Sequence, residues 1–315
     1  MSPLPELRLA LALQGGGAHG AFTWGVLDRL LEEDGFTPAG VSGTSAGALN
    51  AVMLAAGWIA GGPAEARSCL DRFWRRIADE ASHLALLPPG VGAFALGLTA
   101  HLLSPYQLAP NGRHPLARIL SSMIDTAALR RCPFPLLIAA TSARTGMSRV
   151  FTAGELTLDI VLASATLPQI HPAAIIDGEP FWDGGYTLNP PILALAAATR
   201  CRDLLLVRIN RGIADRLPRD AGGIRDRVAE VVFGQPLARE LEALAAARRK
   251  GRLLRLIDPE ARRLAATRLH TVDGAADLAE LPPETKVLPY WPVLAKLKAA
   301  GRAAAATWMG AVARP

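Results

Sequence analysis

Cysteine is scarce in this 315-residue sequence, and its scarcity limits the kinds of fold and site that we expect. Cys69, Cys132 and Cys201 stand far apart and form no C-x-x-C pair. A disulfide framework and a zinc site both require paired or closely spaced cysteines, so we expect neither. Isolated thiols of this kind are typical of a reducing compartment, and the sequence therefore predicts a cytoplasmic protein.

Aromatic residues are also few, at 5% of the chain, and this argues against a nucleic-acid partner. The net charge of +6 and a pI of about 9.7 indicate attraction to something anionic. Proteins that bind nucleic acids usually concentrate such charge on one motif beside aromatic stacking residues, which this sequence lacks. In the densest basic stretch, residues 248–263, apolar residues separate the cations. That pattern predicts a solvated helix face, with peripheral contact to an anionic membrane as the alternative.

The sequence has no apolar run typical of a leader or a membrane anchor. Its first residues, MSPLPELRLALALQ, lack a basic region, and their apolar run ends at a glycine turn, so we expect neither. Residues 45–64 carry no charge but follow a turn and contain several glycines, which favours a buried core helix. Residues 81–112 are also uncharged and are interrupted by four prolines. We expect this segment to be an apolar cap over a substrate cleft, or an ordinary buried connection.

Strand-like and helix-like segments alternate along the chain without a fixed-period repeat or a low-complexity linker. The predicted strands are residues 8–13, 40–42, 136–140, 149–152, 173–176 and 203–209; the predicted helices are residues 21–33, 46–60, 158–164, 191–198 and 292–312. This alternation predicts an α/β fold with a mostly parallel sheet and helices on both faces. Ligands of such sheets bind beyond the carboxyl ends of the strands.

The first predicted strand runs into a glycine turn, QGGGAHG, at residues 14–20. Gly15, Gly17 and Gly20 match the G-x-G-x-x-G spacing of a dinucleotide-binding turn, in which N–H groups at a helix N-terminus hold a pyrophosphate. The second strand of such a unit should end near a carboxylate that binds a ribose hydroxyl. The type of residue at the end of the second strand therefore decides whether this turn is a nucleotide site.

A serine, and not a carboxylate, comes after the second predicted strand. The acidic residues at 32–34 fall within the preceding helical pattern, and Ser45 stands directly behind the strand. We therefore favour an oxyanion hole, in which the bare N–H groups of Gly15, Gly16 and Gly17 face a negative charge that develops during a reaction.

Gly43-Thr44-Ser45-Ala46-Gly47 has the G-x-S-x-G form of a nucleophile elbow. Small residues flank the serine because the turn is strained and the chain passes close to itself, which exposes the hydroxyl. The predicted helix after this turn directs its N-terminal N–H groups at the reacting centre. A glycine-rich turn with an N-capping serine is the structural alternative.

A serine nucleophile needs a base, and the sequence offers two. Ser45, Asp183 and His270 have the chain order of an α/β-hydrolase triad, but the residues around His270 are typical of a strand or surface histidine. Asp183 lies between two aromatic residues and a glycine pair, where desolvation raises the pKa of a carboxylate above its free value of about 3.9. Such a carboxylate accepts the serine proton without an imidazole, and an ordinary Asp-Gly turn is the alternative.

Together, these motifs resemble the patatin-like phospholipase family. The resemblance covers residues 9 to 210 and is carried by four ordered blocks: GGGAHG at 15–20, GTSAG at 43–47, ASATLP at 163–168 and DGG at 183–185. It implies a bacterial serine acyl hydrolase with a three-layer α/β/α fold. We expect one domain over residues 1–315, with a core at 8–210, the candidate cap at 81–112 and a helical, basic C-terminal extension at 211–315.

The resemblance also implies the chemistry. A Ser-Asp dyad of Ser45 and Asp183, with an oxyanion hole from the three glycines at 15–17, would hydrolyse lipid acyl esters of the phospholipase A, lysophospholipase or esterase type, without a metal or a cofactor. Many relatives have Arg at the position of His19, so a fixed positive charge is missing here. We expect His19 to stay neutral near a helix N-terminus, as a hydrogen-bond donor to the oxyanion or as packing for the turn. Ala46 is a second candidate support.

Three alternatives stay open from the sequence. An acyltransferase would pass the acyl group from the same intermediate to an alcohol or thiol, and a storage polyester would replace lipid as the substrate. A nucleotide-binding module of the G-x-G-x-x-G type is the third. The block at 163–168 is expected to shape the sheet edge beside the site and is given no chemistry.

Overall fold

A computed structural model of the protein describes residues 7–84, 104–108, 114–210, 212, 217–249, 258–279, 281, 283–286 and 289–312. Most of the candidate cap at residues 81–112 lies outside the described residues. Residues 250–257, in the middle of the basic stretch, lie outside them as well.

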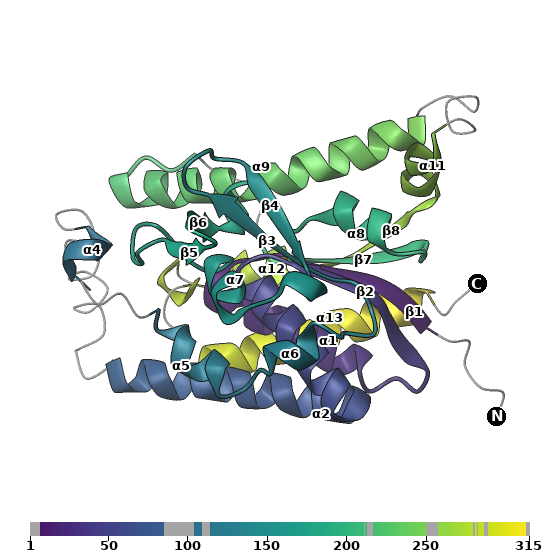
Figure 1. The fold of residues 1–315 in the computed structure, drawn as a ribbon, viewed down its shortest axis with the longest axis horizontal. Helices are drawn as coiled ribbons and strands as arrows, with labels where there is room; N and C mark the ends of the chain where they lie inside the picture. Colours follow the sequence, from purple (N-terminus) through teal and green to yellow (C-terminus); the bar gives the residue numbers. More distant parts are fainter. Residues whose placement is uncertain are drawn as a thin grey trace.

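Eight strands of the described chain form one sheet (Figure 1). They are β1 (Leu7–Leu13), β2 (Phe36–Gly43), β3 (Leu136–Ser142), β4 (Ser148–Thr152), β5 (Ala174–Ile176), β6 (Glu179–Asp183), β7 (Asp203–Arg208) and β8 (Arg268–Asp273). Their order is β5-β6-β3-β2-β1-β7-β8, and β4 also pairs with β3. Strands β3, β2, β1, β7 and β8 run parallel, whereas β4 and β6 are antiparallel to β3. The predicted mostly parallel sheet is therefore confirmed.

Helices cover both faces of this sheet. The α-helices are α1 (Gly20–Leu30), α2 (Ala46–Leu84), α4 (Pro105–Leu108), α5 (Leu116–Ser121), α6 (Thr126–Leu129), α7 (Leu158–Ala163), α8 (Ile192–Ala198), α9 (Ala221–Arg249), α11 (Pro259–Ala266), α12 (Ala275–Ala279) and α13 (Trp291–Val312). Short 3-10 turns are η1 (Gly17–His19), η2 (Ala153–Glu155), η3 (Gly184–Tyr186) and η4 (Pro283–Lys286). Helices α1, α2 and α13 lie on one side of the sheet and α8, α9 and α11 on the other, which gives the three layers (Figure 1).

The two apolar faces of β1 explain the layers. Successive side chains of a strand point to opposite faces, so a strand between two helical layers is apolar throughout. Leu9, Leu11 and Leu13 belong to the core with α1, α2 and α13, whereas Ala10 and Ala12 belong to the core with α8 and α9. The sequence LALAL thus places large side chains under the larger helical layer and small ones under the other.

Two elements are longer than the sequence predicts. Strand β2 begins at Phe36, four residues before the predicted start. Helix α2 runs for 39 residues, well past the predicted end at residue 60. The helical backbone is broken at Gly61 and Gly62, and Gly62 has a φ of 73°, so the prediction identified the break but not the helix that resumes at Pro63.

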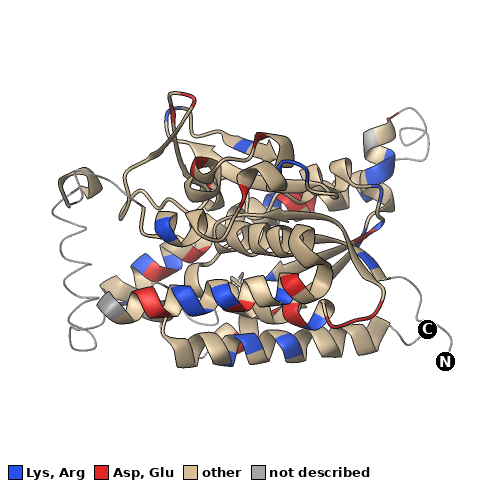
Figure 2. Ribbon diagram, turned by 60° about the horizontal axis from the view of Figure 1, so that its bottom comes forward, with Lys and Arg blue, Asp and Glu red and all other residues tan. Residues whose placement is uncertain are grey.

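Ion pairs connect α1, α2 and α13. Asp28 on α1 is nearly buried and pairs with Arg67 of α2 and with Arg302 of α13, and Glu32 pairs with the same two arginines. Figure 2 shows basic and acidic residues alternating along α2. Several of these charges therefore form ion pairs between helices, and the described part of this face is not a patch of one charge sign.

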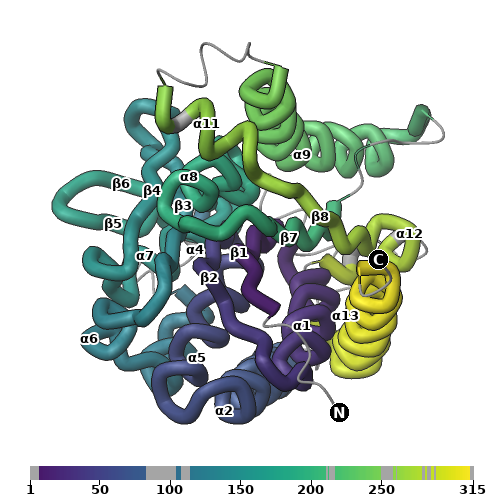
Figure 3. Tube along the Cα trace, turned by 90° about the vertical axis from the view of Figure 1, so that its right-hand side faces the viewer, coloured from purple at the N-terminus to yellow at the C-terminus, as the bar shows by residue number. Residues whose placement is uncertain are grey.

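The C-terminal residues pack directly against the rest of the protein. Strand β8 extends the parallel sheet beside β7, and α13 lies against α1 (Figure 3). The two helices approach closely at glycines: a Cβ at Gly25 would lie 2.0 Å from the Lys298 oxygen, and one at Gly301 would lie 2.0 Å from the Phe22 oxygen. The region expected as an extension thus contributes a strand to the sheet and a helix to one layer.

Candidate active site

Strands β2 and β6 end against the same short stretch of β3. Residues 136–138 of β3 pair with β2, residues 140–142 pair with β6, and residues 137–141 pair with β4. Because β4 overlaps both of the others, it occupies one edge of β3, and β2 and β6 share the opposite edge. They run toward each other, with Gly43 opposite Ile138 and Asp183 opposite Ala140. The carboxyl ends of the two strands therefore meet.

Ser45 lies in a strained turn directly after β2. Its φ is 54°, a left-handed conformation that is costly for a residue with a side chain. The flanking glycines make the turn possible, because a Cβ at Gly43 would lie 2.4 Å from the Gly47 oxygen and one at Gly47 would lie 2.0 Å from the Leu13 oxygen. Helix α2 begins at the next residue, and Ser45 remains partly exposed. This is the geometry expected of a nucleophile elbow.

Asp183 is buried at the end of β6 and faces Ser45. Its Oδ1 atom accepts a 2.7 Å hydrogen bond from the Gly185 N–H. Burial raises the pKa of Asp183 to about 7, although the Gly185 N–H and the nearby Ser45 hydroxyl act in the opposite direction. A carboxylate with this pKa is poised to exchange a proton near neutral pH.

The loop after α7 joins the two halves of the site. Ser164 is buried, and its Oγ atom accepts a 3.0 Å hydrogen bond from the Ser45 N–H. The Ser164 carbonyl accepts from the Gly184 N–H at 3.4 Å, and the Thr166 carbonyl accepts from the Asp183 N–H at 2.8 Å. The sequence predicted that this block shapes the sheet edge beside the site and gave it no chemistry, because nothing in ASATLP indicates its hydrogen-bond partners.

The N–H and the carbonyl of Gly15 are both hydrogen-bonded inside the protein. This corrects the expectation that the Gly15 N–H is an oxyanion donor. Its N–H donates to Asn189 Oδ1 at 2.7 Å, and its carbonyl accepts from Asn210 Nδ2 at 2.7 Å. An N–H that is already bonded to a buried amide oxygen does not stabilise an oxyanion. The described residues provide no hydrogen-bond partner for the N–H of Gly16 or Gly17. The glycine turn therefore retains two candidate donors instead of three.

His19 and Ala46, the candidate supports, are both buried beside the glycine turn. His19 Nε2 lies 2.8 Å from Thr285 Oγ1 in η4. Burial and then the charge of Lys286 lower the pKa of His19 to about 4, so the ring is neutral, as predicted, although burial and not the helix dipole is the main cause. The bond to Thr285 supports the packing interpretation of this residue.

His270 does not join Ser45, and the triad alternative is wrong. His270 lies on β8, where its Nε2 atom is 2.9 Å from Asp203 Oδ1 and its ring packs against Trp308. Strands β1 and β7 separate β8 from β2, and three strand spacings amount to about 14 Å. The structure thus pairs the histidine with a different carboxylate.

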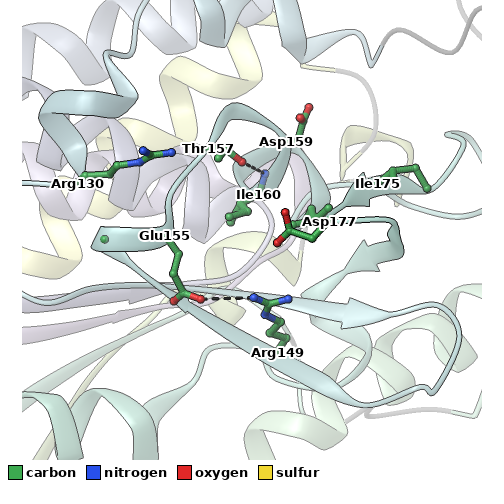
Figure 4. A pocket seen from close by; sticks show the side chains of 10 residues that line it. Arg130, Arg149, Glu155, Thr157, Asp159, Ile160, Ile175 and Asp177 are labelled. Carbon is green, nitrogen blue, oxygen red and sulfur yellow. Dashed lines mark hydrogen bonds and ion pairs between the residues drawn. The ribbon is translucent and has the colours of Figure 1, made fainter.

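A pocket of about 400 Å³ lies at the other end of α7 from Ser164 (Figure 4). It is formed by β4, η2, the start of α7 and the turn between β5 and β6. Arg149 and Glu155 form a 3.5 Å ion pair in its lining, with Asp159 and Asp177 nearby. This charged lining is unsuited to an acyl chain, and we do not regard the pocket as part of the candidate site.

Within the described residues, no helix combines the length and apolar character needed to span a bilayer.

Part of this chain resembles known proteins in sequence. A sequence model of the patatin-like phospholipase family matches residues 11–196. Three proteins named uncharacterized NTE family proteins, two from strains of Mycobacterium tuberculosis and one from Mycobacterium bovis, are 28% identical over 205 residues. Those matches cover 64% of this chain and 49% of each relative, so the chain spans about half the length of these relatives.

The crystal structure of VipD from Legionella pneumophila aligns with 95% of this chain and 68% of its own, with 14% identity and a TM-score of 0.39. The family match is the stronger finding, because it spans more than half of the sequence and includes all four motif blocks. The chain belongs to the patatin-like phospholipase family.

Proposed function

We propose that this protein is a serine acyl hydrolase that cleaves lipid acyl esters, with Ser45 as the nucleophile and Asp183 as the general base. The observation that carries the proposal is that the carboxyl ends of β2 and β6 meet on β3 and bring the Ser45 hydroxyl to a buried carboxyl, whose pKa is raised to about 7. Family membership supports lipid as the class of substrate.

In the first step, the Asp183 carboxylate takes the proton from Ser45 Oγ while Oγ bonds to the ester carbonyl carbon. The π electrons of the carbonyl move to its oxygen, which becomes an oxyanion. When that intermediate collapses, the carbonyl re-forms, the bond to the alcohol breaks, and Asp183 returns its proton to the leaving oxygen. The product of this step is an acyl-Ser45 enzyme and a free alcohol.

In the second step, Asp183 takes a proton from water as the water oxygen bonds to the acyl carbon. Collapse of the second tetrahedral intermediate breaks the bond to Ser45 Oγ, and the proton returns to that oxygen. The N–H groups of Gly16 and Gly17 are the proposed donors to the oxyanion in both steps, with the N–H of Ala46 at the start of α2 as a supporting group. Each such donor typically lowers the barrier by about 3 kcal/mol.

The test uses a fluorophosphonate probe and a soluble ester. We expect the probe to label Ser45 in the wild-type protein, and Ser45→Ala to lose labelling. Ser45→Ala and Asp183→Asn should each lower kcat at least about 1,000-fold. Ser68→Ala, an exposed serine on α2, and His270→Ala are the matched controls and should keep full activity. An active Asp183→Asn variant would refute the dyad.

Product analysis separates the remaining alternatives. With phospholipid as the donor, we expect free fatty acid even when an alcohol acceptor is added; transfer to the acceptor would favour the acyltransferase. A polyester substrate in place of phospholipid would favour the storage-polymer alternative. Binding of a nicotinamide nucleotide without probe labelling would favour the nucleotide module, although the Gly15 N–H that would face a pyrophosphate is bonded to Asn189.

A further inference from the structure

Two buried asparagines hold the Gly15 peptide groups from opposite sides. Asn189, shortly after the DGG block, accepts the Gly15 N–H, and Asn210, just past the end of β7, donates to the Gly15 carbonyl. The two residues are 0% and 7% exposed. Because a carbonyl only accepts hydrogen bonds and an N–H only donates, each partner fixes which end of the asparagine amide faces Gly15.

Each asparagine is itself held in place. Asn189 Nδ2 donates to the Phe233 carbonyl on α9 at 3.0 Å. The backbone N–H groups of Ile209 and Asn210 donate to Gln14 Oε1 at 2.9 and 3.0 Å. The side-chain amide of Gln14 therefore bonds to the chain after β7, and the side-chain amide of Asn210 bonds to the turn after β1.

The bond from Asn210 fixes the direction of a proposed oxyanion donor. The carbonyl of Gly15 and the N–H of Gly16 belong to the same planar trans peptide, so they point in opposite directions. With the carbonyl held toward Asn210 at 2.7 Å, the Gly16 N–H must point away from Asn210. A hydrogen bond to the carbonyl also polarises the N–H of the same peptide group and makes it a better donor.

We propose that Asn210 is a positioning residue that orients the Gly16 N–H for the oxyanion, and that Asn189 supports it by fixing the preceding peptide. The inference rests on the proposed acyl hydrolysis. According to this inference, Asn189 and Asn210, which lie outside the glycine turn, align the Gly16 N–H within the turn. Glycine has no side chain that could hold this peptide plane, so the alignment comes from the hydrogen bonds to the asparagines.

The test is Asn210→Leu, which removes the donor but keeps the branching and the number of side-chain heavy atoms, with Leu204→Ala as the matched control. Leu204 is buried at the opposite end of β7, so its truncation destabilises the same strand without touching the glycine turn. If Asn210→Leu does not fold, Asn210→Ser replaces it, because the shorter hydroxyl does not reach the Gly15 carbonyl. The readouts are kcat and KM for p-nitrophenyl butyrate and the Ki of a trifluoromethyl ketone, which forms a tetrahedral oxyanion adduct on serine.

For the Asn210 variant we expect kcat to fall by about 10- to 1,000-fold with KM nearly unchanged. The Ki of the trifluoromethyl ketone should rise by the same factor as kcat/KM falls, and the pH dependence set by Asp183 should stay in place. Leu204→Ala should lower stability and leave the kinetics and the Ki unchanged.

Several results would overturn the inference. A folded Asn210 variant with kcat within threefold of wild type, or one with raised KM and normal kcat, would show that Asn210 does not act on the oxyanion. An unchanged Ki, or equal losses in Leu204→Ala, would do the same. If the wild-type protein is not labelled at Ser45 and hydrolyses no ester, the proposed function fails first and this inference with it.

Discussion

The backbone N–H of Ser45 donates a 3.0 Å hydrogen bond to the hydroxyl oxygen of Ser164, 119 residues further along the chain. Ser164 is fully buried, and its own carbonyl receives the Gly184 N–H beside the proposed base. One residue therefore supports the strained turn that holds the proposed nucleophile and contacts the segment that carries the proposed base.

The first prediction concerns Ser164→Ala. The change leaves the Ser45 N–H without its acceptor, so we expect a loss of about 1–3 kcal/mol in the free energy of unfolding. Probe labelling of Ser45 should also slow, because the φ of 54° at Ser45 loses part of its support. Urea denaturation and labelling rates measure the two effects. Ser68→Ala, which removes an exposed hydroxyl, is the control, and equal behaviour of the two variants would contradict the role of Ser164.

The second prediction is the pH dependence of hydrolysis. The proposed base, Asp183, can accept a proton only when it is ionised, and burial raises its pKa to about 7. We therefore expect kcat/KM for a soluble ester to rise with pH through about 7 and to level off above it. His19 does not contribute a step in this range, because its pKa is lowered to about 4. A profile that is flat between pH 5 and 9 would exclude Asp183 as the base.

The third prediction is that Asp183→Asn stabilises the protein above pH 7. The pKa of this carboxyl is 3.8 in its ordinary state and about 7 in the fold, so the folded protein binds the extra proton between those values. The free energy of unfolding of the wild type therefore falls as pH rises through that window. Asparagine does not titrate, and the variant should gain up to about 4 kcal/mol over the wild type above pH 7.

Urea denaturation at pH 4 and pH 8 tests this expectation. The advantage of Asp183→Asn should be large at pH 8 and small at pH 4. A difference that does not change with pH would mean that Asp183 is not held in a buried site with a raised pKa.

The fourth prediction concerns Gly17→Ala. Gly17 has a φ of 61°, and a Cβ there would lie 2.2 Å from the Lys286 oxygen in η4. We expect a loss of about 2 kcal/mol or more in stability together with loss of ester hydrolysis, since the turn must move away from η4. Gly154→Ala is the control, because nothing lies within 4 Å of a Cβ at that position. Thermal unfolding and activity of the two variants decide the point.

The N-terminal half of the fold was predictable because its signals are local. The apolar strand before Gly15 and the glycines around Ser45 each indicate their own conformation, and the two strands β1 and β2 pair side by side. Strand β8 gave no comparable signal: its six residues pair with β7 across about 65 positions of sequence, and only that pairing makes them a strand.

The site was predictable to the level of residue types but not of hydrogen bonds. The motif at 15–20 identifies a turn with bare amides. It does not indicate which of these amides is already hydrogen-bonded inside the protein, and the amide of Gly15 is bonded in this way. Asn189 and Asn210 are single asparagines, one before a proline and one after a strand, and both patterns are typical of ordinary turns. A signal was nevertheless present: Asn210 comes after an apolar strand at the carboxyl edge of the sheet, where ligands of parallel sheets bind.

The shared edge of β3 makes the spacing of Ser45 and Asp183 independent of the rest of the chain. The spacing of Ser45 and Asp183 is set by main-chain pairing with three neighbouring positions of one strand, and not by the lengths of the segments that connect them. Insertions or deletions in the segments between these strands would therefore leave that spacing intact. The surroundings of the proposed pair can change in length while its two members stay together.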